Sequence, residues 1–230
     1  MNRKFILFII LLAAIFFVSP AKAHRPRLVY KQVLSQDQPA VIKDPNISQA
    51  FYGELKGQAD YYQLDLKTPL NFYFGLLSPV IKLDHQDFSA EIITNNVDSL
   101  NSSFFTLENP GVLWDPYFEK FAGDKYYKGP EATVPLPAGS YLIRITNPDN
   151  QGKYTLFIGK QESFPPSEII NTLLELPTLK RDFFAAPVFS AYFNLIGLFS
   201  AIFLAAFIIL ILLIKKLFLK RVNKNINKNL

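Results

Sequence analysis

Hydrophobic and polar residues alternate over much of the chain between residues 50 and 160. The alternation is clearest in the segments Tyr141–Ile145 and Tyr154–Ile158, where apolar residues recur at every second position. The segment between them, NPDNQG at 147–152, has the residues that tight turns require. A period of two places one face of a strand against a core and the other toward solvent, so the two segments predict a β-hairpin.

The same period appears in four earlier segments, at residues 51–55, 62–66, 70–76 and 88–92. These segments are rich in aromatic and branched apolar residues and follow one another at intervals of roughly ten residues, as the strands of β-sandwiches do. No segment indicates alternating β and α units. We therefore expect a mainly β fold, an antiparallel, jelly-roll-like β-sandwich over residues 24–164.

The period changes after Pro166, where the apolar positions no longer alternate. Ser167 is a suitable helix cap, and five apolar residues between 169 and 176 predict a short helix that ends at Pro177. We expect residues 165–190 to form a juxtamembrane helix and linker near the outer headgroups of a membrane. A helix packed on the sandwich is the alternative.

The N-terminal 23 residues have the pattern of a secretory signal peptide. Arg3 and Lys4 precede an uninterrupted apolar segment from Phe5 to Val18, and Ala21-Lys22-Ala23 is an acceptable cleavage site. The apolar segment is shorter than the roughly 20 residues that a membrane span needs. Cleavage after Ala23 would make His24 the mature N-terminus, whereas an uncleaved anchor is the alternative.

A second apolar segment, residues 191–214, carries no charge and is long enough to cross a bilayer. The tail at 215–230 holds six Lys and Arg residues and no acidic residue. Its length and its basic flank favour a transmembrane helix over a buried core helix. By the positive-inside rule, the tail lies in the cytoplasm and the N-terminus outside the cell membrane, in a single-pass arrangement.

Charge and cysteine content narrow the function further. Residues 24–190 carry 15 Lys and Arg against 19 Asp and Glu, so the predicted exported part is acidic and lacks the basic face that nucleic-acid binding needs. The absence of cysteine excludes disulfides, thiol catalysts and thiolate metal sites. Together with the Lys- and Asn-rich tail, it favours a bacterial envelope.

Two segments resemble a known family. Residues 51–65, FYGELKGQADYYQLD, are similar to the opening of bacterial pre-peptidase C-terminal-type domains, and LPAGSYLIRI at 136–145 followed by GKYTLFIG at 152–159 is similar to their closing hairpin. The resemblance implies a small jelly-roll-like sandwich that accompanies exported proteins and that binds polymers or has no assigned role.

The two histidines are candidate metal ligands. An N-terminal His24 would offer its α-amine and its imidazole, and His85, in the acidic DHQD segment, would complete a three-nitrogen site of the kind that Cu(II) favours. In position, His24 resembles the N-terminal histidine of copper-resistance proteins and lytic polysaccharide monooxygenases. The alternative is that His24 merely follows the cleavage site and that His85 lies on an acidic loop.

The segment 114–127, WDPYFEKFAGDKYY, is the other candidate site. Its aromatic residues Trp114, Tyr117, Tyr126 and Tyr127 could stack on sugar rings or pack against a partner, or be buried under their own loop. Asp115, Glu119 and Asp124 offer oxygens to calcium, although the spacing is not that of an EF-hand. No motif of a known enzyme class is present, so we expect no enzyme activity.

Three hypotheses follow for the function. The first is a non-enzymatic, membrane-anchored domain that binds an envelope protein or polysaccharide. The second is a copper-binding ectodomain that uses His24. The third is an accessory subunit of a membrane complex, held in place by its transmembrane helix.

Overall fold

The computed structural model describes residues 24–82, 86–94, 102–109 and 111–226. The described residues fall into two compact units, one ending at Ala191 and one that begins at Tyr192. The first unit contains all described strands and a short helical segment. The second contains one long helix.

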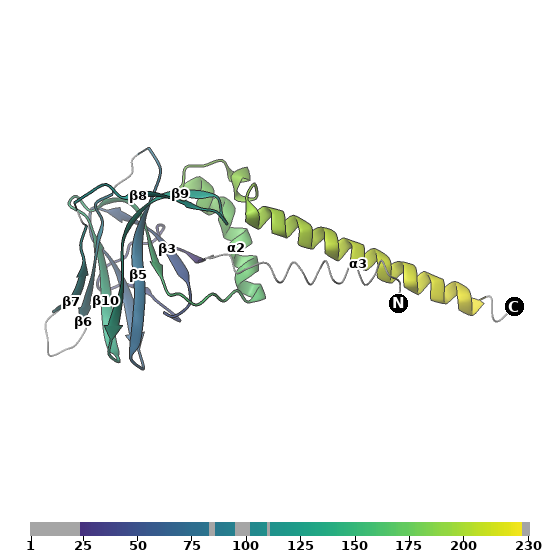
Figure 1. The fold of residues 1–230 in the computed structure, drawn as a ribbon, viewed down its shortest axis with the longest axis horizontal. Helices are drawn as coiled ribbons and strands as arrows, with labels where there is room; N and C mark the ends of the chain where they lie inside the picture. The colour runs from purple at the N-terminus through teal and green to yellow at the C-terminus, as the bar shows by residue number, and fades with distance from the viewer. Residues whose placement is uncertain (1–23, 83–85, 95–101, 110, 227–230) are drawn as a thin grey trace. The chain divides into compact units, whose positions relative to one another are not determined.

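Two sheets form the first unit (Figure 1). The six-stranded sheet has the order β1 (Arg25–Leu28), β3 (Gln49–Lys56), β11 (Gln151–Ile158), β5 (Leu70–Pro79), β9 (Asp124–Leu136) and β8 (Asp115–Glu119). The five-stranded sheet has the order β2 (Ala40–Val41), β4 (Asp60–Leu66), β10 (Gly139–Thr146), β6 (Ser89–Thr94) and β7 (Ser103–Leu107). Among the described strands, β1 and β2 pair in parallel with their neighbours and all other pairs are antiparallel.

The core lies between the two sheets and is filled by the alternating residues of the sequence. On β5, Phe72, Phe74 and Leu76 have no exposed surface, and the same is true of Ile143 and Ile145 on β10. These side chains belong to one continuous hydrophobic cluster. The mainly β, sandwich fold predicted from the period-two pattern is therefore confirmed.

A short chain of polar groups crosses this apolar core. The hydroxyls of Tyr62 and Tyr154 lie 2.7 Å apart, and the Tyr154 hydroxyl donates to Asp60 Oδ2 at 2.6 Å. Gly53 leaves room for the Tyr154 ring, because a Cβ at this position would come within 2.3 Å of it. The glycine and the Asp-Tyr-Tyr sequence of the segment 51–65 thus serve one buried hydrogen-bonded arrangement.

The outer face of the six-stranded sheet is partly covered as well. The chain continues from α2 (Pro166–Thr178) into a π-helical turn, η1 (Leu179–Phe183). The Phe183 ring lies 5.1 Å from Tyr52, and the Phe184 ring lies 5.4 Å from Tyr126. The residues from 179 to 184 therefore form a second, smaller apolar layer on the outside of β3 and β9.

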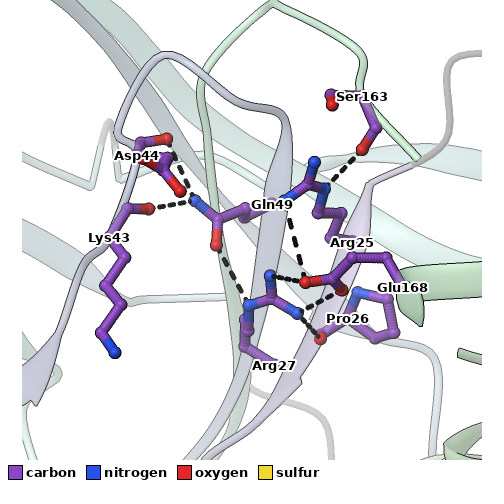
Figure 2. Close-up of polar contacts among 8 residues, drawn as sticks. All are labelled: Arg25, Pro26, Arg27, Lys43, Asp44, Gln49, Ser163 and Glu168. Atoms are coloured by element: carbon purple, nitrogen blue, oxygen red, sulfur yellow. Dashed lines mark hydrogen bonds and ion pairs between the residues drawn. The ribbon is translucent and has the colours of Figure 1, made fainter. Parts of the chain in front are cut away.

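An ion pair fixes the start of α2 to the edge of the sandwich (Figure 2). Arg27 donates to both carboxylate oxygens of Glu168, at 2.9 and 3.0 Å, and Arg25 lies 3.7 Å from the same carboxylate. Arg27 also donates to Gln49 on β3 at 3.1 Å. Because planar, bidentate Arg–carboxylate contacts are geometrically specific, they define how α2 lies on β1.

The α-helix ends at Thr178, one residue after the predicted end at Pro177, but the helical path does not stop there. Pro177 lies inside α2, and helical backbone continues through η1 to Phe183. Proline removes one backbone donor from the helix, and the widened π-turn that follows is one way in which a helix accommodates such a loss. After a short non-helical segment in which Ala185 has a positive φ of 51°, η2 (Val188–Ala191) packs back against α2.

The second unit contains α3 (Leu195–Ile226). The stretch Leu195–Lys220 covers 26 residues and contains an 18-residue window with a mean hydropathy of 3.0, so it is long and apolar enough to cross a membrane. Asn194 precedes the helix and accepts the Gly197 amide at 3.1 Å through its side chain. This capping bond explains why the helix begins later than the predicted residue 191.

Candidate binding site on the outer sheet face

A cavity of about 390 Å³ lies on the outer face of the six-stranded sheet. Its lining comes from strands β5, β8, β9 and β11, from the residues that precede β1 and β3, and from the segment that follows β11. The side chains that define its chemistry are His24, Tyr73, Tyr117, Lys128, Glu131, Phe157 and Lys160. Residues far apart in the sequence are thus brought into one concave surface by strand pairing.

The floor of the cavity is aromatic. The Phe157 ring lies 5.7 Å from the Tyr73 ring and 5.9 Å from the His24 ring. Phe157 lies over Gly75, where a Cβ would come within 2.3 Å of the ring and 2.7 Å of the Glu131 Cβ. The shape of this floor therefore depends on a glycine in the middle of β5, where a side chain would point outward.

Polar groups surround the aromatic floor and are bonded to one another. Tyr73 donates to Glu131 Oε2 at 2.8 Å, and the Lys128 ammonium lies 3.1 Å from the same oxygen. Lys160 lies 4.3 Å from the centre of the Tyr73 ring, a cation–π distance, and donates to Thr133 at 3.3 Å. The cavity therefore offers both hydrogen-bond donors and acceptors close to aromatic faces.

The ionisation of these groups follows from their partners. Partial burial acts to raise the pKa of Glu131, but hydrogen bonds from Tyr73 and Lys128 outweigh it and hold the pKa below its usual value. Burial, followed by the hydrogen bond to Glu131, raises the pKa of Tyr73 well above its usual value. At neutral pH, Glu131 is therefore an ionised acceptor and Tyr73 a neutral donor.

His24 lies at the end of the cavity next to Ser48. Its Nδ1 is 2.6 Å from the Ser48 hydroxyl, and burial lowers its pKa to about 4, so the imidazole is neutral at physiological pH. His85, the second predicted copper ligand, lies outside the described residues. In the part of the chain that the structure describes, no three His, Asp or Glu side chains form a metal-binding group. Copper binding therefore stays a prediction.

The predicted aromatic segment does not form one surface. Trp114 is 4% exposed and packs on Phe88, and Tyr126 is 3% exposed beneath Phe184. Tyr127 packs against the core, whereas Tyr117 is 39% exposed and lines the cavity. Only Tyr117 of the four predicted residues is thus placed with His24 at the cavity.

Two of the three carboxylates proposed for calcium, those of Glu119 and Asp124, are engaged elsewhere. Glu119 accepts the backbone amides of Phe121 and Ala122 at 2.8 and 2.6 Å, which closes the β8–β9 turn. Asp124 accepts a hydrogen bond from the buried ammonium of Lys180. These two side chains therefore stabilise the local fold, and their oxygens are not directed at a shared cation position.

No protein-family model and no curated protein match the sequence. Among solved structures, the chain is similar to the crystal structure of the pre-peptidase C-terminal domain of a collagenase from Bacillus anthracis. The TM-score is 0.35 at 12% sequence identity, over 56% of this chain and 96% of that domain.

Proposed function

We propose that this chain is a membrane-anchored, extracytoplasmic binding domain that takes a sugar unit of an envelope polysaccharide into the cavity on its six-stranded sheet. In this proposal the signal peptide directs export, α3 is the anchor and the sandwich is a non-enzymatic module outside the cell. The supporting observation is the combination, in one cavity, of the aromatic faces of Tyr73, Tyr117 and Phe157 with nearby charged side chains.

This combination suits a sugar better than the other ligand classes considered. A pyranose ring has an apolar C–H face that can lie on an aromatic ring and hydroxyls that both donate and accept hydrogen bonds. Glu131 supplies an acceptor, and Lys128 and Lys160 supply donors. Because cations and carboxylates are mixed, a polyanion such as a nucleic acid gains little here.

Binding by the full chain in lipid nanodiscs tests this proposal. Soluble fragments of bacterial cell-wall polysaccharide would be titrated against wild type, Tyr117→Ala and Phe118→Ala. Tyr117 lines the cavity, whereas Phe118 is its exposed neighbour on β8 and points to the other face. We expect Tyr117→Ala to weaken binding about tenfold and Phe118→Ala to leave it unchanged. Equal affinities for all three chains would refute the site.

A further inference from the structure

The helix α2 has two sides with different surroundings. On one side Leu176 is 3% exposed, and Glu168 is held by Arg25 and Arg27 as Figure 2 shows. This side is fixed on the edge of the sandwich at β1. The helix α2 is therefore an integral part of the folded sandwich unit and not a loose linker.

Another side of α2 is apolar and exposed. Ile170 and Leu174, one helical turn apart, are 57% and 72% exposed, whereas Ile169, two turns from Leu176 on the same side, is 47% exposed. We call Ile170 and Leu174 the α2 apolar face. Exposed apolar side chains at positions i and i+4, on a helix whose other side is fixed on the sandwich, have the arrangement by which amphipathic helices meet an apolar surface.

The chain itself indicates what this surface meets. The 3₁₀ turn η2 packs against α2 and ends the sandwich unit at Ala191, and the apolar helix α3 begins at Leu195. Four residues cover at most about 14 Å when extended. The segment that joins η2, which packs against α2, to the apolar helix α3 is therefore short, whatever orientation the two units take.

We infer that the α2 apolar face inserts into the outer interfacial layer of the bilayer that α3 crosses. This inference rests on the membrane anchoring in the proposed function. Amphipathic helices at such interfaces bury their apolar side by roughly 5–10 Å. Glu168, the acidic residue in the first turn of α2, is neutralised by two arginines, so it brings no unpaired carboxylate toward anionic headgroups.

The absence of cysteine allows a direct test on the full chain. Leu174→Cys and Leu113→Cys would each be labelled with a fluorophore and reconstituted in phosphatidylcholine vesicles with brominated acyl chains. Leu113 is 85% exposed and precedes β8, the edge strand at the far end of the sheet from β1. We expect lipid quenching at position 174 to exceed that at position 113 by about twofold or more, because bromine quenches only nearby probes.

Flotation of the same vesicles separates the inference from the proposed function. If the chain does not float with the vesicles, the anchoring fails and the inference fails with it. If it floats but position 174 is quenched no more than position 113, only the inference is overturned. Position 174 shielded from aqueous quencher but not quenched by lipid would also overturn it, in favour of a second copy or a protein partner.

Discussion

At the scale of single residues, Gly75 is the position on which the shape of the cavity most depends. A Cβ there would overlap the Phe157 ring, whereas at Gly139, on β10, the nearest atom to a Cβ would be 3.6 Å away. We predict that Gly75→Ala lowers the free energy of unfolding by about 1–3 kcal/mol, as overpacking does, and that Gly139→Ala leaves it nearly unchanged. Urea unfolding of residues 24–191 measures both. Comparable effects of the two substitutions would show that Phe157 does not lie over Gly75.

His24 gives a prediction for pH dependence. Its pKa is about 4 in the folded chain and 6.5 in an unfolded one, so between these values the unfolded state binds more protons. The contribution of His24 to the free energy of unfolding therefore rises as the pH goes from about 4 to about 6.5, and it is constant above that range. Burial raises the pKa of Asp60 and of Asp124 to about 6, so their contributions to stability fall as the pH rises, opposite to that of His24. The effect of His24 must therefore be isolated by comparing wild type with a variant that lacks it.

The measurement is the difference in unfolding free energy between wild type and His24→Gln across this pH range. We expect wild type to lose stability relative to the variant as the pH falls from 6.5 to 4. An NMR titration giving His24 a pKa near 6.5 would contradict the buried position. Copper coordination at Nδ1 would compete with the hydrogen bond between this atom and the Ser48 hydroxyl.

At the scale of elements, the turn η1 and the residue after it hold the second apolar layer in place. Phe183 has no exposed surface, whereas Phe189, six residues on, is 66% exposed. We predict that Phe183→Ala costs about 3–5 kcal/mol of stability, as for other buried aromatic residues, and that Phe189→Ala costs less than about 0.5 kcal/mol. Thermal unfolding of residues 24–191 compares them, and similar melting temperatures for both variants would contradict the packing of η1.

The same element carries a buried ion pair between Lys180 and Asp124, whose side chains are 3% and 5% exposed. Burial is the main reason that the pKa of Asp124 rises, and Lys180 opposes it. We predict that Lys180→Met destabilises the unit by about 3–5 kcal/mol, since it leaves a buried carboxylate unpaired. Adding Asp124→Asn should restore much of that loss in a double-mutant cycle, and strictly additive effects would exclude the pairing.

Elements that follow from a local sequence pattern were predicted, whereas elements held by contacts between residues far apart in the sequence were not. The inner face of β5, with Phe72, Phe74 and Leu76, follows from local alternation alone. The layer around Phe183 does not, because it covers Tyr52 from more than a hundred residues away and the intervening chain has no period that reveals it. For this reason the predicted sandwich ended at residue 164, whereas the compact unit extends to Ala191.

The candidate site was predicted in part for the same reason. His24 and Tyr117 were singled out by position and composition, and both line the cavity. Tyr73 and Phe157 were missed, although each is an aromatic residue at an outward position next to alternating residues that point into the core. Aromatic residues at outward positions of strands indicate a surface site in the sequence. Only strand pairing shows that Tyr73 and Phe157 lie next to each other.

At the scale of the whole molecule, the chain combines a compact β-sandwich unit with one apolar helix. The order of segments, an N-terminal signal pattern, a sandwich, α3 and a basic end, is the basis for the proposed location of each. The proposed polysaccharide site requires the sandwich to lie outside the cell. The proposed insertion of the α2 apolar face requires in addition that α2 reaches the outer surface of the membrane. Their location is therefore the central claim.

Thiol labelling in intact bacterial cells tests that claim most directly, since the natural chain has no cysteine. One variant carries Leu113→Cys in the sandwich unit and another carries Asn229→Cys at the basic end, and both are treated with a membrane-impermeant maleimide. The proposed topology predicts labelling of Leu113→Cys in intact cells and of Asn229→Cys only after permeabilisation. Labelling of Asn229→Cys in intact cells, or protection of Leu113→Cys until lysis, would contradict it.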